Sequence, residues 1–279
     1  MARKWRNRIF WCLCGVAFAC IAAPAVAIVV SVFHQAWPAL GMHLLTKGTN
    51  ADGLQNAILG TLLLLLGVLV VAGTIGVMAG IYLAEFASPR IGAPLRFFSE
   101  VLAGMPSIVI GYVGYIALVV GFHWGYSLSA AVLALSVLVV PYIVKTTEVA
   151  LRAVPKALRE ASAALGVSRT KTIFKVLIPP ALPGIVSGLI VALAISTGET
   201  APLLFTAGFS DKNPILGLTH HQLGYLTDVT FTDLSLPGAK AHALAAAAGA
   251  VTLIILVLLI AVGRIASTRA RRATERMSL

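Results

Sequence analysis

The chain has 279 residues, of which 59% are hydrophobic and 11% are charged, and its formal net charge is +11. Soluble domains carry roughly 45–50% apolar and about 25% charged residues. The composition therefore excludes a water-soluble fold, whose surface could not be covered with so few charges, and it also excludes intrinsic disorder. The three cysteines, Cys12, Cys14 and Cys20, lie in one apolar run, which excludes a disulfide framework and offers no zinc-type spacing.

Six apolar segments are long enough to cross a bilayer as helices, which requires about 20 mostly apolar residues each. They occupy residues 9–33, 57–84, 98–121, 127–144, 182–207 and 243–262. The sequence therefore predicts an all-α polytopic membrane protein with six transmembrane helices in a single domain over residues 1–279. Gly76 and Gly80 in the second segment lie one turn apart, which favours close helix packing, either within the chain or toward a second subunit.

The basic residues predict the orientation of these spans. With six spans, all 21 lysines and arginines except Lys47, Lys212 and Lys240 fall on the same side of the membrane. Because Lys and Arg accumulate in cytoplasmic loops, both termini are predicted to be cytoplasmic. The basic excess then follows from topology and requires no nucleic-acid partner, and the tail 264–279 is expected to lie against anionic membrane lipid.

The N-terminal segment allows a second interpretation. A basic start, an apolar stretch and Ala25-Val26-Ala27 resemble a cleavable signal peptide. The apolar run extends to Phe33, well beyond the usual hydrophobic region of such peptides. An uncleaved first span is therefore the favoured interpretation.

The loop between the fourth and fifth spans, residues 146–181, is too polar for lipid and too regular for a linker. A helix-forming run ends at Gly166, which suits a left-handed helix cap. Ser168 is placed to cap a second short helix over 169–177, and Pro179-Pro180 is expected to end that helix. The sequence predicts two short helices broken at Gly166, which either dock on a soluble partner or pack on the bundle as an interfacial loop.

The same loop carries a spaced motif. The motif consists of Glu160-Ala161-Ser162, three residues, Gly166, nine residues and Val176-Leu177-Ile178-Pro179. It resembles the EAA motif in permease subunits of binding-protein-dependent ABC importers. The family pattern is Glu-Ala-Ala, three residues, Gly, nine residues and Ile-x-Leu-Pro, so this chain departs mildly at Ser162, Val176 and Ile178. The resemblance implies the MetI-like fold of type I importers. It also implies a coupling helix through which four residues contact an ATPase subunit: Glu160, Ala161, Ser162 and Gly166.

The fifth span contains a polar island around Glu199. A carboxylate inside a span is costly and marks a functional site by default. Pro202 cannot donate a hydrogen bond to the Gly198 carbonyl, so it is expected to kink or unwind the helix there. Broken helices are where transporters bind and pass solutes. Ser196, Glu199, Thr200 and Pro202 are therefore predicted to line a translocation path; alternatively, Glu199 only reaches outer headgroup water and anchors the helix end.

Two further segments narrow the resemblance to one group of importer permeases. Gly198–Ala207 and, in the third span, Met105-Pro106-Ser107-Ile108-Val109-Ile110-Gly111 are similar to signatures of phosphate importer permeases of the PstA type. Pro106 and Ser107 are the signature residues of span three. Many members of that group carry an arginine four residues before the glutamate, where this chain has Ile195. The resemblance therefore leaves open which chain supplies positive charge to an anion path.

The resemblance to PstA-type permeases also implies partners and a location. The partners are a second phosphate permease subunit of the PstC type, ATPase subunits of the PstB type and a phosphate-binding protein of the PstS type. The substrate is inorganic phosphate, and the location is the bacterial plasma (inner) membrane. The chain lacks a Gly-x-x-x-x-Gly-Lys-Ser/Thr loop, so it is expected to be a transport subunit and not an enzyme. ATP and Mg²⁺ would bind to the partner ATPase, and no cofactor is expected in this chain.

The anionic substrate raises a physical question, because no Lys or Arg lies within the six spans. Either a partner permease supplies an arginine that pairs with Glu199, or Glu199 accepts a hydrogen bond from a protonated phosphate oxygen. The second solution would reject sulfate, which carries no proton at neutral pH. Two alternative functions remain open: a permease for another oxyanion, and an ion-gradient-driven secondary transporter with Glu199 as proton carrier.

The outer loop 208–242 is long for a connection in a helix bundle, which indicates a role. Together with residues 46–56 it is expected to form a docking surface for the binding protein. His220 and His221 are adjacent and do not share a helix face, so no metal site is predicted. On the opposite side, Glu85 and Glu100 are expected to pair with nearby arginines as cytoplasmic-end charges.

Overall fold

The computed structural model describes residues 2–215 and 217–277, and this part of the chain contains helices and no strands. The spanning helices are α1 (Ala2–Ala36), α3 (Gln55–Glu85), α6 (Leu128–Arg152), α9 (Ile178–Gly198) and α12 (Ala239–Met277). Shorter elements are α2 (His43–Thr46), the 3₁₀ turn η1 (Thr49–Ala51), α4 (Pro89–Ala103), α5 (Ser107–Gly114), α7 (Lys156–Ala164), α8 (Arg169–Lys171), α10 (Ala201–Thr206) and α11 (Leu226–Ser235). Two π-helical segments, η2 (Tyr115–Gly121) and η3 (Thr172–Leu177), complete the order.

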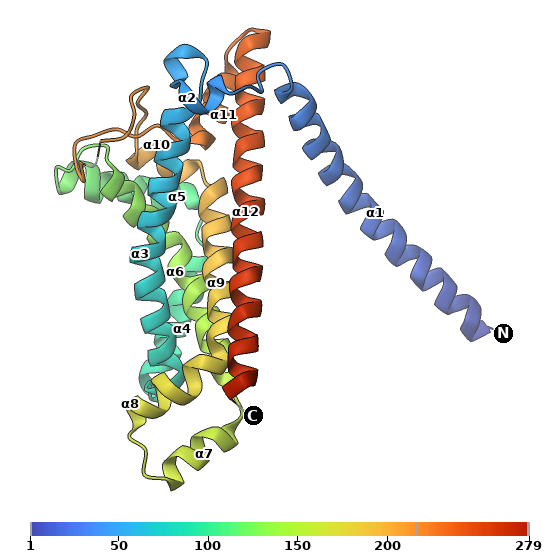
Figure 1. Cartoon of the computed structure of the whole chain (residues 1–279), viewed down its shortest axis with the longest axis vertical. Coiled ribbons are helices and arrows are strands. Elements are labelled where there is room, and N and C mark those ends of the chain that lie inside the picture. Colours follow the sequence, from blue (N-terminus) through green and yellow to red (C-terminus); the bar gives the residue numbers. More distant parts are fainter. Residues whose placement is uncertain (1, 216, 278–279) are drawn as a thin grey trace.

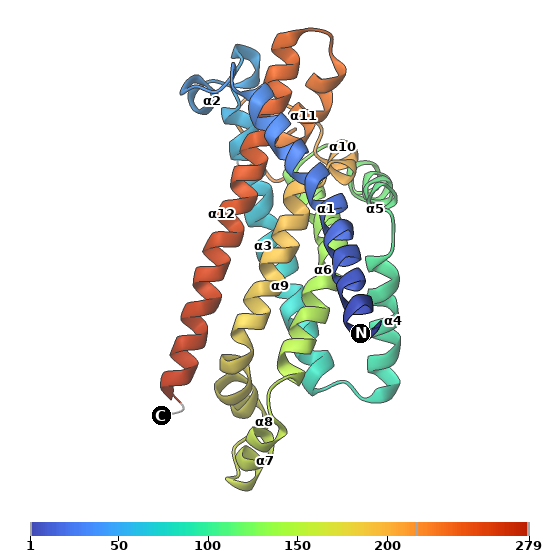
Figure 2. The same ribbon diagram turned by 90° about the vertical axis from the view of Figure 1, so that its right-hand side faces the viewer.

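The helices form an elongated bundle with distinct ends (Figures 1 and 2). Helix α6 is the most enclosed span, and it packs between α3 and α9, while α12 packs along α9. Helices α7 and α8 lie at one end, and α2 and α11 lie at the other. The loops predicted to be cytoplasmic and those predicted to be outside are thus at opposite ends of the bundle.

The third predicted span is not a straight helix. Over the described residues, five continuous helices are long and apolar enough to cross a membrane, and a sixth span exists only if α4 and the α5–η2 segment are counted together. These two parts meet at an angle of 98°. The break falls where Gly104 ends α4 and Pro106 precedes α5. Proline has no N–H to continue the helix and keeps the residue before it out of the helical region, so Pro106 breaks the span that the sequence predicted as one helix.

The close contact between α3 and α6 is built on the two glycines noted in the sequence. A Cβ at Gly76 would lie 2.7 Å from the Ile143 side chain, and one at Gly80 would lie 2.6 Å from Cβ of Thr147. Small residues let helix backbones approach in this way. The glycine face therefore serves packing within the chain and is not available to a second subunit.

Helix α1 stands apart from the bundle along most of its length (Figure 1). Its apolar window has no buried residue, and its outer end alone packs on the rest of the chain. There, Val32 and Ala36 join an apolar cluster with Leu226 and Ala247. The first span is thus connected to the bundle at one end only.

The loop between α6 and α9 follows the prediction in its first half. Helix α7 ends at Ala164, and Gly166 has a left-handed φ of +67°. Ser168 stands at the next N-cap position, although its side chain makes no capping hydrogen bond. The two predicted short helices are therefore broken at Gly166.

The prediction that Pro179-Pro180 ends the second short helix is wrong, since residues 169–198 are helical without interruption. The π-helical segment η3 comes directly before α9, and Pro179 lies in the first turn of α9. Where the hydrogen-bond register changes from π to α, backbone groups lose their regular partners in any case. Prolines without an N–H are tolerated at such a point.

Candidate functional site

The fifth span is interrupted at Glu199. Helix α9 ends at Gly198 and α10 begins at Ala201, with Glu199 in an extended conformation between them. The interruption frees the Glu199 main-chain carbonyl, which accepts a hydrogen bond from the Thr227 hydroxyl at 3.0 Å. The break beside Pro202 that the sequence predicted is thus present and is stabilised by the outer helix α11.

The Glu199 side chain is half-buried. No hydrogen bond or ion pair joins its carboxylate to the described part of the chain. A carboxylate that is partly removed from water and lacks an internal partner is available to a ligand or to another subunit. Thr200 is also half-buried, whereas the ring of Pro202 is buried in the packing of α10.

Ser196 occupies a different environment from Glu199. The residue is 4% exposed, and its hydroxyl donates to the Ala192 carbonyl one turn earlier at 3.0 Å. Hydroxyls bonded to their own helix in this way carry no free donor. The structure places Ser196 within the helix packing and does not bring it beside Glu199 as an open polar group.

The two sequence signatures lie against each other. Helix α5 packs on α10, and a Cβ at Gly111 would lie 2.6 Å from Cα of Pro202. Beside this contact, the rings of Tyr112 and Phe205 meet edge to face with centroids 6.1 Å apart. Pro106 is exposed at the preceding break, and Ser107 begins α5. The re-entrant third span and the broken fifth span therefore form one unit, which the sequence could not join.

Helix α7 has two faces. Glu160, Ala161 and Gly166 are exposed, and Leu165 is 81% exposed although it is apolar. Ser162 differs from these residues, because it is 6% exposed and its hydroxyl donates to the Leu158 carbonyl at 2.8 Å. Three of the four predicted coupling residues are free to meet a partner, while Ser162 faces the rest of the chain.

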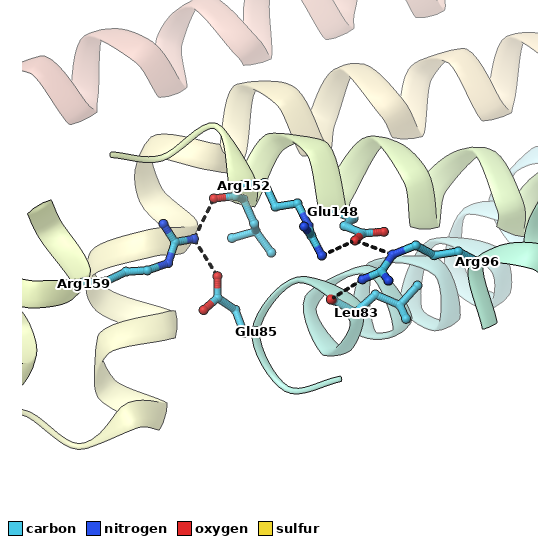
Figure 3. Close-up of polar contacts among 7 residues, drawn as sticks. Leu83, Glu85, Arg96, Glu148, Arg152 and Arg159 are labelled. Atoms are coloured by element: carbon cyan, nitrogen blue, oxygen red, sulfur yellow. Dashed lines mark hydrogen bonds and ion pairs between the residues drawn. The ribbon is translucent and has the colours of Figure 1, made fainter. Parts of the chain in front are cut away.

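The inward face of α7 carries Arg159, which sequence reasoning counted only as a basic charge (Figure 3). Its guanidinium donates to the Glu85 carboxylate at 2.7 Å and to the Leu151 and Val154 carbonyls, each at 2.8 Å. Glu85 was expected to pair within its own loop, but its partner lies 74 residues later in the chain. The sequence holds no local signal for this pair.

A second group of charges joins α4 to α6 (Figure 3). Arg96 donates to Glu148 at 2.8 Å and to the Leu83 carbonyl at 3.1 Å, and Arg152 pairs with Glu148 at 2.9 Å. Glu148 is 8% exposed and was missed by sequence reasoning, although its four-residue spacing from Arg152 is the usual signal for a helical ion pair. Glu100 pairs with Lys145 at 3.4 Å on the surface.

The two outer loops share one surface, as the sequence predicted. The Thr49 hydroxyl donates to Asp211 at 2.7 Å, and the Asn56 amide donates to the Ser210 carbonyl at 2.8 Å. In α11, burial raises the pKa of Asp228 above its usual value. Burial also raises the pKa of Tyr225, the residue before α11, so the phenol stays protonated. Within the described ranges no three His, Cys, Asp or Glu side chains are placed to hold a metal ion, His220 and His221 included.

Comparisons with known proteins place the chain in a family. A family described as "Binding-protein-dependent transport system inner membrane component" matches residues 76–272. The chain is 44% identical over 272 residues to "Phosphate transport system permease protein PstA 2" of Mycobacterium bovis, which covers 97% of this chain and 90% of that protein. It is 36% identical over 226 residues to "Probable ABC transporter permease protein YqgI" of Bacillus subtilis, covering 77% of each.

Solved structures share the fold. A chain of the MetNI methionine ABC transporter, in an inward-facing conformation, matches with a TM-score of 0.56 at 23% identity, over 78% of this chain and 95% of that chain. A chain of an amino acid ABC transporter matches with a TM-score of 0.55 at 22% identity, over 77% and 92%. The prediction of an all-α, MetI-like permease fold is therefore confirmed.

The interrupted spans, the projecting α7 and these matches define a multi-pass membrane transport subunit. The chain belongs to the family of binding-protein-dependent transport system inner membrane components. The resemblance to PstA-type permeases, predicted from the two signatures, is confirmed by the identity over nearly the whole chain.

Proposed function

We propose that this chain is a permease subunit of an ATP-driven importer of inorganic phosphate in the bacterial plasma membrane, with both termini in the cytoplasm. It forms half of the translocation path and pairs with a second permease of the PstC type. Two further kinds of partner complete the assembly: PstB-type ATPase subunits, which bind ATP and Mg²⁺, and a PstS-type phosphate-binding protein on the outer side. The similarity to the Mycobacterium bovis protein named as a phosphate permease supports this substrate.

The observation that carries the proposal is the position of α7. This helix projects from the end of the bundle where the basic loops gather (Figure 1), with Glu160 and Ala161 exposed and Leu165 almost fully uncovered. A short projecting helix with an exposed carboxylate, followed at its end by an exposed apolar side chain, suits the groove of a soluble partner. In the proposal the ATPase subunit receives this face, and closure of the ATPases moves the helix.

The path is proposed to run beside the break between α9 and α10. Glu199 is half-buried there without an internal partner in the described chain. A hydrogen bond from a protonated phosphate oxygen to this carboxylate would favour phosphate over sulfate, because sulfate has no proton to donate at neutral pH. An arginine from the second permease, paired with Glu199, is the alternative that the Ile195 position leaves open.

The experiment is uptake of radiolabelled phosphate and sulfate by cells with a clean deletion of the gene and no other phosphate importer. The deletion strain is complemented with wild type, Glu160→Lys, Glu199→Gln or the control Glu100→Lys, and membrane levels of each protein are matched. We expect loss of phosphate uptake in the deletion, full rescue by wild type and the control, and no rescue by Glu160→Lys. Glu199→Gln is expected to lower phosphate uptake and the preference over sulfate.

Three results would contradict the proposal. Normal phosphate uptake in the deletion would refute the substrate. Loss of sulfate or another oxyanion instead would identify a permease for that anion. Uptake that survives both Glu160→Lys and removal of the ATPase partner would indicate an ion-gradient-driven carrier with Glu199 as the proton site.

A further inference from the structure

The end of α3 nearest α7 is held by three arginines from other elements. Arg96 of α4 donates to the Leu83 carbonyl, and Arg159 of α7 donates to the Glu85 carboxylate. Arg169, the first residue of α8, donates to the Glu85 main-chain carbonyl, and its guanidinium lies 4.6 Å from the ring centroid of Phe86. Cations are favoured at a helix C-terminus, where carbonyls lack helical partners and carry partial negative charge.

Chain connectivity makes the contact between α7 and α3 different from the other contacts of α7. Helix α7 is joined covalently to α6 on one side and to α8, η3 and α9 on the other. Helix α3 lies much earlier in the chain, with Glu85 74 residues before Arg159, and has no such connection to α7. The pair of Arg159 and Glu85 therefore links α7 to a span that chain connectivity does not reach (Figure 3).

The environment of this pair makes its loss costly. The side chains of Glu85 and Arg159 are 10% and 27% exposed, whereas those of Glu100 and Lys145, on the same side of the molecule, are 67% and 70% exposed. Exposed pairs contribute little, but removal of one partner from a buried pair leaves an uncompensated charge. Arg159 also fastens the Leu151 and Val154 carbonyls at the end of α6, so one guanidinium holds α3, α6 and α7 together.

We propose that Arg159 is a positioning residue that transmits movement of α7 to α3 through Glu85, so that α3 and α6 move as one block when the ATPase subunits close. The proposal rests on the proposed function, in which the ATPase subunit binds α7 and moves it when the ATPases close. Helix α3 carries the glycine face that locks it to α6, so a force delivered to the α3 end reaches the centre of the bundle. The path-forming break on α9 is then moved by both its chain connection and the α3–α6 block.

The test uses the complete transporter with its partner subunits in proteoliposomes. Phosphate transported per ATP hydrolysed is measured for wild type, Glu85→Gln, Arg159→Gln, the double variant, Arg159→Lys and the matched control Glu100→Gln. We expect each single Gln variant at the buried pair to lower this ratio by about tenfold, within the usual range of coupling between sites. The double variant should be no worse than either single variant, Arg159→Lys should retain part of the ratio, and Glu100→Gln should match wild type.

A second readout separates transmission from docking and from folding. The ATPase subunits should co-purify with each variant in wild-type amounts. In a background with Cys12, Cys14 and Cys20 replaced by Ala, spin labels at Met78 on α3 and Lys156 on α7, both exposed, report the distance between the helices. Wild type should keep one narrow distance in the resting and nucleotide-trapped complex, and Arg159→Gln should broaden it on trapping.

Several results would overturn the proposal. These are a wild-type transport ratio in both Gln variants, additive losses in the double variant, loss of the ATPase subunits from the complex, or an unchanged spin-label distance in Arg159→Gln. Failure of the proposed function is distinguishable, because it would appear as a wild-type complex that transports no phosphate. The distance measurement depends on nucleotide alone and still decides whether α3 follows α7.

Discussion

The end of the bundle around α7 and the interior of the spans are held together by different forces. Among the described residues, all four ion pairs lie at the α7 end, and three of them involve the nearly buried carboxylates of Glu85 and Glu148. Within the spans, glycines bring α3 and α6 into contact, and hydroxyls such as Ser196 and Thr197 bond to their own helix. The difference follows from the solvent. Lipid cannot solvate a charge, so helix packing within the spans depends on shape, whereas ion pairs with defined geometry can form where the protein meets water.

The test of this comparison with the largest expected effect is Gly80→Val in the α3–α6 contact. The new side chain would overlap Thr147 and the Val144 carbonyl, and overpacking of this kind costs about 3 kcal/mol in stability. We expect a lower thermal unfolding temperature in detergent and less protein in the membrane. Gly15→Val is the control, since nothing lies within 4 Å of a Cβ at Gly15 on α1. Equal stability of the two variants would show that shape does not hold the interior.

A second test concerns the contact between α5 and α10. Gly111→Ala places a methyl group 2.6 Å from Cα of Pro202, so the re-entrant segment must move away from the broken span. We expect uptake to fall by about tenfold, which corresponds to about 1.4 kcal/mol in the barrier, at an unchanged membrane level. Gly104→Ala is the matched control, because a Cβ there meets only ordinary contacts at 3.6 Å. Similar uptake by both variants would show that the translocation path does not depend on the contact between α5 and α10.

At the α7 end, Gly166→Ala tests backbone conformation without steric overlap. Gly166 has a φ of +67° and nothing within 4 Å of a Cβ, so alanine adds only the cost of the left-handed conformation, about 1–2 kcal/mol. We expect faster proteolytic cleavage between α7 and α8 and a moderate loss of uptake. Gly166→Asn should be milder, because asparagine tolerates this region. A variant with Asn as damaging as one with Ala would point to a contact made by the glycine itself.

The smallest expected effect is at the outer end, in Asp228→Asn. Burial raises the pKa of Asp228, so the folded state binds its proton more readily than the unfolded state does. Stability from this group is therefore complete below the ordinary pKa of 3.8 and declines as pH rises through the folded pKa. We expect the variant to unfold at a slightly higher temperature than wild type at pH 7, with the difference vanishing near pH 3. Asp52→Asn at an exposed position is the control, and a difference that persists at pH 3 would exclude titration as the cause.

The sequence predicted features that depend on neighbours in the chain. The cap at Gly166 and the helix break beside Pro202 follow from the backbone limits of single residues, and both are present. The 98° bend of the third span was not predicted, because residues 98–121 form one apolar segment in the sequence and the angle depends on how Gly111 packs against α10. The prediction that Pro179-Pro180 ends a helix was wrong because a change of helical hydrogen-bond register cannot be read from residue type.

The candidate site was predictable in part. The EAA spacing located α7, and the polar island located the interruption at Glu199, since each is a local pattern. The inward orientation of Ser162 and the joint between Arg159 and Glu85 depend on how segments far apart in the chain meet. Charge counting identifies orientation across the membrane, but it does not assign partners to individual arginines.

Helix α1 shows that a fold can leave the order of apolar residues in one of its spans almost unconstrained. Since its apolar window is uncovered by the rest of the chain, lipid or another subunit surrounds those side chains, and their order need not match any surface of the bundle. Only the outer end, near Val32 and Ala36, must fit a neighbour in this chain. Shuffling Leu, Val, Ile and Ala between residues 13 and 30 should therefore leave the fold of residues 55–262 unchanged, whereas the same exercise on α6 would destroy it.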